Sequence, residues 1–279
     1  MPVKRWGMHR MKNKVIHNMS NAQYHAQTDY FSSSFGKETE KNSIEHAKKG
    51  TVELGWETQA VGDSLHANVL EPEKDLVLCG PETRRGKDWK DAHLAAELDG
   101  KILLTAKLYD QVQYMAESLL SHPDCGRLLK CPSRVCETSI FVTDPKTNVK
   151  IRCRGDVYSK DLVELGDVKS CISAHPRQWT RQAWKLMYPI QAAWYVHCHD
   201  IMGIKVKKFS FLCVEKTYPY VSHRFQVSPE VMAWGMQKVR EILSRIAIAQ
   251  AQDDWSHGWG DSTIMELPTW LKEVQDERF

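Results

Sequence analysis

The fold of this chain is decided by residues 154–170, which read Arg154-Gly155-Asp156-Val157-Tyr158-Ser159-Lys160-Asp161-Leu162-Val163-Glu164-Leu165-Gly166-Asp167-Val168-Lys169-Ser170. Short segments rich in Val, Leu and Tyr lie on either side of Lys160-Asp161, and this composition is typical of paired β-strands. We therefore predict a β-hairpin whose turn lies at Lys160-Asp161.

The hairpin would bring two carboxylates and a lysine to one place. Asp167 and Lys169 are two residues apart, so their side chains leave the same face of a strand. Val168 points to the opposite face, and its carbonyl is available to a metal ion. Asp156 lies near the end of the preceding strand, where a tight hairpin would place it beside Asp167.

Phosphodiester hydrolysis is the chemistry that uses such a trio. Two neighbouring carboxylates can hold Mg²⁺, which also binds phosphate oxygens and acidifies a bound water. A lysine on the same face can orient that water or stabilise the charge that develops on the phosphate. The alternative is an exposed hairpin with ordinary surface charges, because charged side chains mostly lie in solvent. The rest of the chain favours the nuclease interpretation.

The hairpin belongs to a longer run of predicted strands. A turn at 144–148 precedes it, and three successive antiparallel strands form a meander. Glu137 would lie either near the metal or at an edge of the sheet. The strands of this meander are residues 137–142, 149–158 and 162–170.

Two predicted helices carry polar candidates. Residues 57–70 form a helix with one apolar side, and His66 lies on it. A lone histidine near an apolar face is more often a structural residue than a ligand. A later helix has Pro189 in its first turn, and its Gln191 and Tyr195 are four residues apart on one face. That face either packs in the core or lines the path of a nucleic-acid strand.

Other segments complete the outline. We predict a strand at 204–216 with a basic start, and a basic glycine-containing loop at 84–90. Residues 205–208 are candidates for contact with a phosphate backbone; residues 84–90 either make such a contact or form an ordinary solvated loop. Ser20, the run Ser32-Ser33-Ser34 and Ser228 are candidate helix caps. The remaining predicted helices are residues 37–50, 104–120 and 228–253.

Composition is that of an ordinary globular protein. The chain has 279 residues, 42% of them hydrophobic and 26% charged, with a net charge of +3. A nucleic-acid site must therefore be a local basic patch. No apolar run has the roughly 18 residues of a membrane span, and the basic start lacks the apolar region of a secretory signal. We expect a cytoplasmic protein without membrane contact.

The eight cysteines are scattered and contain no CxxC pair. We therefore do not expect a structural zinc site. Several of the cysteines lie among apolar strand residues, so they are most simply small buried hydrophobic residues in a reducing compartment.

Several short motifs occur in a characteristic order along residues 18–271. A histidine on a helix is followed by an aspartate, a DxK motif and a QxxxY motif, and this order is more specific than any one of them. The residues are Tyr24-His25, Ser32-Ser33-Ser34, Gly62-Asp63-Ser64-Leu65-His66, Leu70-Glu71-Pro72-Glu73, Glu137-Thr138-Ser139-Ile140-Phe141, Arg154-Gly155-Asp156, Asp167-Val168-Lys169, Tyr188, Gln191, Tyr195, Trp259 and Leu267-Pro268-Thr269-Trp270.

In this order the chain resembles the RecE family of exonucleases (exonuclease VIII), in the RecB-like branch of the PD-(D/E)xK nuclease superfamily. The resemblance implies an α/β fold with a restriction-endonuclease-like core, in which helices flank a mixed sheet that carries the antiparallel meander. It further implies a single domain over residues 18–279, preceded by a flexible basic segment at 1–17.

The resemblance also implies roles for individual residues. The metal ligands would be His66, Asp156, Asp167 and the Val168 carbonyl, and Lys169 would be the catalytic lysine. Glu137 would lie beside the metal, and Gln191 and Tyr195 would hold the scissile strand.

The implied activity is Mg²⁺-dependent exonuclease action on the ends of double-stranded DNA, with Mn²⁺ able to substitute. One strand would be degraded 5′→3′, which leaves a 3′ single-stranded tail for a single-strand annealing protein in recombination. The family also suggests a homo-oligomeric ring, a tetramer. The rivals are an endonuclease or junction resolvase of the same superfamily, and a catalytically inactive DNA-end-binding protein.

The sequence departs from the pattern in small ways. Gly155 stands where the wider superfamily has proline, and only the following aspartate is chemically required. Asp167 stands where many relatives have glutamate, which shortens the arm but keeps the charge. Iron–sulfur relatives have a cysteine cluster after the QxxxY helix, whereas only Cys198 and Cys213 follow it here, so we expect no cluster.

Overall fold

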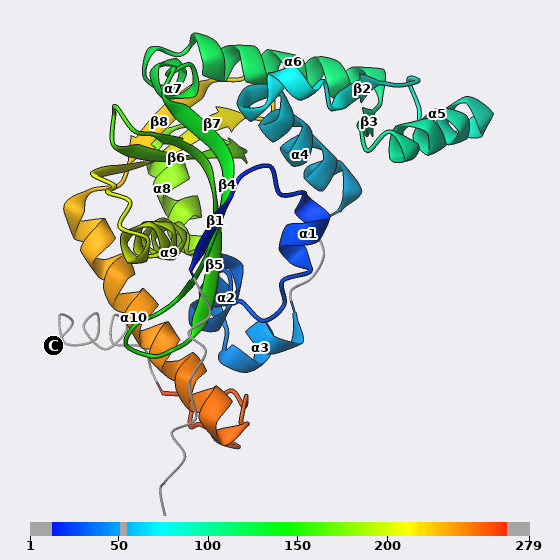
Figure 1. Cartoon of the computed structure of the whole chain (residues 1–279). Coiled ribbons are helices and arrows are strands. Elements are labelled where there is room, and N and C mark those ends of the chain that lie inside the picture. The colour runs from blue at the N-terminus through cyan, green and yellow to red at the C-terminus, as the bar shows by residue number, and fades with distance from the viewer. Residues whose placement is uncertain (1–12, 51–54, 267–279) are drawn as a thin grey trace, which may run out of the picture.

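The computed structural model describes residues 13–50 and 55–266. Its centre is a mixed six-stranded sheet with the strand order β1-β4-β5-β6-β7-β8, flanked by helices (Figure 1). The predicted α/β fold is confirmed. The strands are β1 (Lys14–Ile16), β4 (Arg134–Thr143), β5 (Lys150–Ser159), β6 (Glu164–Cys171), β7 (Lys208–Glu215) and β8 (Ser222–Gln226).

The predicted meander forms the middle of this sheet. β4 pairs with β5 and β5 with β6 in antiparallel fashion. β6 then pairs in parallel with β7 along its whole length, from Glu164 opposite Lys208 to Cys171 opposite Glu215. This parallel pair makes the sheet mixed. At Asp167 and Lys169, β6 is paired with β7 alone, because its ladder with β5 ends at Gly166.

Helices cover both faces of the sheet. α4, α6 and α7 pack on one face, where they meet Val157 and Val168 of the sheet. α9 and α10 pack on the other face against Ile151 and Cys153. The helices are α1 (Asn21–His25), α2 (Ser33–Lys41), α3 (Ile44–Lys49), α4 (Trp56–Leu70), α6 (Ala106–Ser121), α7 (Pro123–Leu129), α8 (Pro176–Lys185), α9 (Tyr188–Ile201) and α10 (Pro229–Gln252), with a 3-10 turn η1 (Pro72–Lys74).

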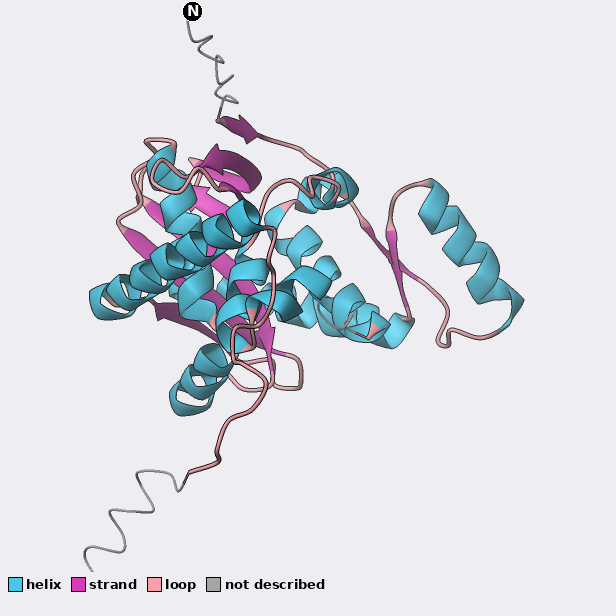
Figure 2. Ribbon diagram, turned by 90° about the horizontal axis from the view of Figure 1, so that it is seen from below, coloured by secondary structure: helices cyan, strands magenta, loops and turns pink. Residues whose placement is uncertain are grey.

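An arm formed by residues 77–104 extends from this body. It consists of the parallel strands β2 (Val77–Cys79) and β3 (Ile102–Leu104) and the helix α5 (Gly86–Leu98) between them, and both views show it standing apart from the sheet (Figures 1 and 2). The prediction of a loop at 84–90 was wrong, because α5 begins at Gly86. Trp89 buries its ring in a small cluster with Leu103, and this contact favours the helix.

Several local predictions are confirmed and others are corrected. Ser20, Ser32 and Ser228 cap their helices, as their side-chain oxygens accept backbone N–H bonds, and Pro189 lies in the first turn of α9. Residues 14–16 form an edge strand paired with β4, so this part of the expected flexible segment is ordered by sheet pairing.

The helix predicted at 37–50 is two helices. α2 ends at Lys41, and Ser43 caps a new helix that begins at Ile44. The strand predicted at 204–216 begins only at Lys208. The motif Leu267-Pro268-Thr269-Trp270 lies outside the described residues.

Among the described residues, no helix combines the length and the apolar character that crossing a lipid bilayer requires.

Candidate metal and nuclease site

The strands of the meander separate where the acidic residues lie. The β4–β5 ladder includes Cys136 opposite Val157 and Thr138 opposite Gly155 but skips the pair between them. That pair would be Glu137 and Asp156, and Glu137 has a left-handed backbone with φ of 48°, which is unusual for a residue other than glycine. This interruption frees both carboxylates from the regular pleat.

The β5–β6 ladder also ends beside Asp156. Its last pair is Val157 opposite Gly166, and a continued register would place Asp156 opposite Asp167, as the hairpin predicts. Instead Asp156 Oδ2 accepts a hydrogen bond from the Val168 N–H at 2.7 Å. The aspartate side chain therefore replaces the missing backbone pair between the two strands.

Strand alternation reverses at the same point. Ile151 and Cys153 pack with α9 and α10, whereas Val157 packs with α4 and α6. Residues an even number apart on a regular strand share a face, so the reversal must lie between Cys153 and Val157. It turns the Asp156 region toward α4, from which His66 projects.

His66, Glu137 and Asp156 form a group of possible metal ligands. One donor atom from each lies within 4.8 Å of the other two. His66 Nδ1 is 3.7 Å from Glu137 Oε1, and His66 Nε2 is 3.7 Å from Asp156 Oδ2. His66 Nε2 also contacts the Val168 carbonyl oxygen at 3.1 Å. One imidazole, two carboxylates and a carbonyl fit a divalent cation that accepts oxygen and nitrogen ligands.

The proton affinities of these groups reflect the crowded negative charge. Burial disfavours the charged imidazole, but Asp156 and Glu137 outweigh it and raise the pKa of His66 to about 9. Burial, and then the charge of Asp167, raise the pKa of Asp156 to about 7. A bound cation would displace protons from both groups, because metal ligands must be deprotonated.

Asp167 and Lys169 form a second unit beside this group. They share the face of β6 that was predicted, and the Lys169 ammonium pairs with Asp167 Oδ2. Asp167 Oδ1 accepts from Gln191 Nε2 at 2.8 Å, and the same Nε2 is 3.3 Å from the Tyr195 hydroxyl. Burial opposes the Lys169 charge, but Asp167 and Asp156 raise its pKa above the ordinary value.

The structure therefore brings together the predicted residues in a modified arrangement. Among the described residues, Glu137 rather than Asp167 completes the group of mutually close donors. Asp167 is instead held by its lysine and by Gln191, and its charge still acts on Asp156. The assignment of Asp167 as a metal ligand stays a prediction.

Sequence reasoning missed Lys37, on α2. Its Nζ donates to Gln191 Oε1 at 3.1 Å, across a separation of 154 residues. The contact depends on Gly36, since a Cβ there would lie 2.9 Å from the Trp194 ring. Its local signal was weak: a lysine on a polar helix normally indicates a solvated face.

Arg154 was quoted in the motif but given no role. Its Nε donates to Ser139 Oγ at 2.9 Å and lies 3.9 Å from Glu137 Oε2. Its Nη2 donates to the Met19 carbonyl at 2.9 Å. The side chain thus anchors the segment before α1 to the sheet, next to the Glu137 carboxylate.

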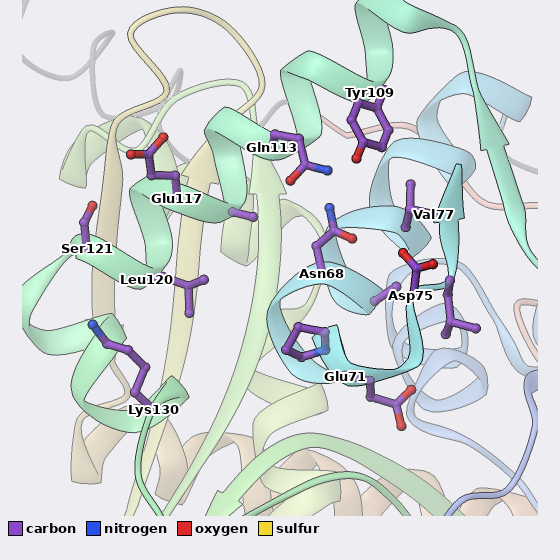
Figure 3. A pocket seen from close by; sticks show the side chains of 14 residues that line it. Asn68, Glu71, Asp75, Val77, Tyr109, Gln113, Glu117, Leu120, Ser121 and Lys130 are labelled. Carbon is purple, nitrogen blue, oxygen red and sulfur yellow. The ribbon is translucent and has the colours of Figure 1, made fainter. Parts of the chain in front are cut away.

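A cleft of about 620 Å³ opens onto the metal-ligand group, and its lining includes Tyr24, Asp63, Tyr195 and the three donors. A second hollow of the same volume lies between the end of α4, η1 and α6 (Figure 3). It is lined by Asn68, Asp75 and Glu117 and contains none of the predicted site residues. The chemistry therefore belongs to the first cleft.

A mixed sheet whose meander presents acidic residues and a lysine, flanked by helices, defines the class of PDDEXK-like domains. The chain belongs to the family described as "PDDEXK-like domain of unknown function (DUF3799)", whose sequence profile matches residues 25–266. No curated protein gives a match to this chain.

Two crystal structures give the comparison with solved folds. One, from Eubacterium rectale and described as a "Putative exonuclease", covers 92% of this chain and 98% of its own length, with a TM-score of 0.60 and 13% identity. At this identity the likeness shows the fold. The structure of SSO0001 covers 66% of this chain and 84% of its own, at 11% identity and a TM-score of 0.31, which is too low to support an argument.

Proposed function

We propose that this protein is a metal-dependent exodeoxyribonuclease that degrades one strand of linear duplex DNA from its end. The observation that carries the proposal is the convergence of His66, Glu137 and Asp156 on one point, beside the Asp167–Lys169 pair. These residues come from the helix α4 and the paired strands β4 and β5. A structural role alone would not require three ionisable groups of this kind to lie together, one of them buried and two partly buried, at the edge of a cleft.

The cation would be held by the imidazole, the two carboxylates and the Val168 carbonyl, and we propose Mg²⁺, with Mn²⁺ as a substitute. When bound it supplies a Lewis acid for a phosphate oxygen and lowers the pKa of a water. Lys169, oriented by its pair with Asp167, would donate to the attacking water or to a phosphate oxygen. Gln191 and Tyr195, which bond one another, would position the strand.

The finer features of the proposal follow the family resemblance. We propose 5′→3′ polarity, a 3′ single-stranded product, a single-strand annealing partner and a homo-oligomeric ring. A crystal structure with a similar fold is described as a "Putative exonuclease", and we propose exonuclease action for this chain as well. We propose that residues 205–208 and 84–90 contact the phosphate backbone of the DNA. Residues 84–90 include the first turn of α5, which begins at Gly86.

Digestion of linear duplex DNA labelled separately at its 5′ and 3′ ends tests the proposal. With Mg²⁺ the 5′ label should be released first as mononucleotides or short products, and a chelator should stop the release. Early release of the 3′ label would reverse the polarity. A linear substrate left intact with both Mg²⁺ and Mn²⁺ would contradict nuclease activity.

The two rival functions give different results in the same assay. A covalently closed circular duplex should survive an exonuclease and be cut by an endonuclease or resolvase. An inactive end-binding protein would bind the linear duplex and release nothing. The intact His66, Asp156, Asp167 and Lys169 argue against a decayed site.

A further inference from the structure

The corner of the site around Tyr188 holds two lysines. Lys169 Nζ lies 5.4 Å and Lys37 Nζ lies 5.3 Å from the centre of the Tyr188 ring. They come from different elements, β6 and α2, and both side chains remain partly exposed. Each ammonium is attracted to the electron-rich face of the ring, so the tyrosine holds two like charges near one another.

The two lysines differ in their acidic partners. Lys169 is paired with Asp167. Within residues 13–50 and 55–266, Lys37 has no carboxylate within salt-bridge distance, and its hydrogen-bond acceptor is the neutral Gln191 amide. Lys169 is also attracted by Asp156, so Lys37 is the lysine of this pair that lacks a carboxylate at salt-bridge distance, and an anionic ligand would supply that partner.

Lys37 is held in a position that disfavours its charge. Burial, and then repulsion by Lys169, lower the pKa of Lys37 to about 8. The lysine is nevertheless held in place: α2 packs against α9 through Gly36, and Trp194 of α9 is fully buried. The helix therefore presents a partly buried cation to the site instead of leaving it fully in water.

The hydrogen bond of Lys37 has a second consequence. An amide has distinct donor and acceptor ends, and Gln191 Nε2 is directed to Asp167 Oδ1. The Lys37 ammonium at Oε1 fixes this orientation. An ammonium has three N–H donors, so the others remain available to a ligand.

We propose that Lys37 is a second phosphate-binding lysine of this site, which contacts a phosphodiester group of the DNA strand while it orients the Gln191 amide. The inference rests on the proposed nuclease function. The singly charged phosphodiester would supply the anionic partner that Lys37 lacks, and Lys169 then serves the reacting phosphate while Lys37 holds the strand.

The test is the salt dependence of DNA affinity, measured by fluorescence anisotropy of a linear duplex in EDTA, so that no strand is cut. Each lost lysine–phosphate contact should reduce the slope of log affinity against log salt by about 0.9. The variant Lys37→Gln loses the charge but keeps an N–H donor for Gln191. It should bind about 10- to 100-fold more weakly, with the reduced slope, and raise KM more than it lowers kcat.

Two variants serve as controls. Lys37→Arg keeps the charge and should keep the wild-type slope. Lys41→Gln makes the same change on the same helix at an exposed position and should leave slope and affinity unchanged. Thermal unfolding of each variant verifies that it is folded.

A change on the DNA side keeps the inference testable if Lys37→Gln does not fold. Neutral methylphosphonates at the end of the duplex should reduce the slope of the wild-type protein by about 0.9 for each charged contact removed, and they should reduce it equally for Lys37→Arg, which keeps the charge. An unchanged wild-type slope overturns the proposal.

The outcomes separate the two levels of the argument. Wild-type slope and affinity in folded Lys37→Gln would overturn the phosphate contact and leave the nuclease function standing. A wild-type protein that neither binds nor cuts linear duplex would overturn the proposed function and the role of Lys37 with it.

Discussion

The replacement of Asp167 by asparagine separates the chemistry of the site from its architecture. The amide keeps the size of the side chain, and its oxygen can still accept the 2.8 Å hydrogen bond from Gln191 Nε2. Its nitrogen, however, would face the Lys169 ammonium, so an ion pair becomes a contact between two donors. The change removes one negative charge from a side chain that is 1% exposed.

The expected magnitudes follow from this geometry. Loss of one preorganised charged group from an active site typically costs about 100- to 1000-fold in rate, so Asp167→Asn should lower kcat by at least about 100-fold. Folding should suffer less, by about 1–3 kcal/mol for a buried donor left without its partner. That corresponds to roughly 2–4 °C in Tm for each kcal/mol in a chain of this size.

The assay compares release of labelled nucleotides from linear duplex with thermal unfolding and DNA affinity of the same preparations. Asp161→Asn, an isosteric change at the exposed hairpin turn, is the matched control and should be fully active. Asp167→Asn should bind DNA and melt cooperatively but release almost nothing. A rate within threefold of wild type would show that this aspartate takes no part in the reaction.

Three further predictions concern metal and stability. Mn²⁺ at a hundred times its Kd should raise the free energy of unfolding by about 2.7 kcal/mol. At a fixed Mn²⁺ concentration this increase should be larger at pH 8 than at pH 6, because protons must leave His66 and Asp156 when the ion binds. His66→Ala or Asp156→Asn should abolish the increase. Glu164→Gln should lower the free energy of unfolding by about 3–5 kcal/mol at pH 7. Burial raises the pKa of this fully buried acid, but Arg224 and Ser210 outweigh burial and lower the pKa below 4.5. The stabilisation by the carboxylate is therefore present above pH 4.5 and lost as the pH falls through the lowered pKa. Gly36→Ala should destabilise by about 1–3 kcal/mol through overpacking, whereas Gly62→Ala in open space on α4 should stabilise by about 0.5–1 kcal/mol.

Each of these has a clear contrary result. A manganese-induced shift in Tm that survives in His66→Ala would place the ion elsewhere. If wild type and Glu164→Gln unfold at the same pH in acid, the Glu164 carboxylate is not stabilised by Arg224. A Gly36→Ala variant that is as stable as wild type or more stable would contradict the close contact between α2 and α9.

The local elements of this protein could be predicted from its sequence because their causes are local. The alternation through Asp167, Val168 and Lys169 placed the acid and the lysine on one face of a strand. The serine caps and Pro189 fixed helix starts through contacts within three or four residues. The order of motifs then indicated the PD-(D/E)xK superfamily, and this indication is confirmed by the matching profile of a PDDEXK-like domain.

The composition of the donor group could be only partly predicted. His66 and Val168 are 102 residues apart, and their proximity was inferred from the family resemblance alone. Glu137 joined the group because its left-handed backbone interrupts the β4–β5 ladder. A sequence pattern of regular strands assigns Glu137 to an ordinary alternating position and does not reveal the interruption.

What the sequence by itself determined is therefore the identity of the strands and of the residues that face one way on each. What only the tertiary structure decided is which charges are close to one another, above all Lys37 with Gln191 and Glu137 with His66. The physical reason is range: backbone periodicity and capping act over a few residues, whereas charge pairing depends on the packing of helices such as α2 and α4 against a sheet formed by distant segments.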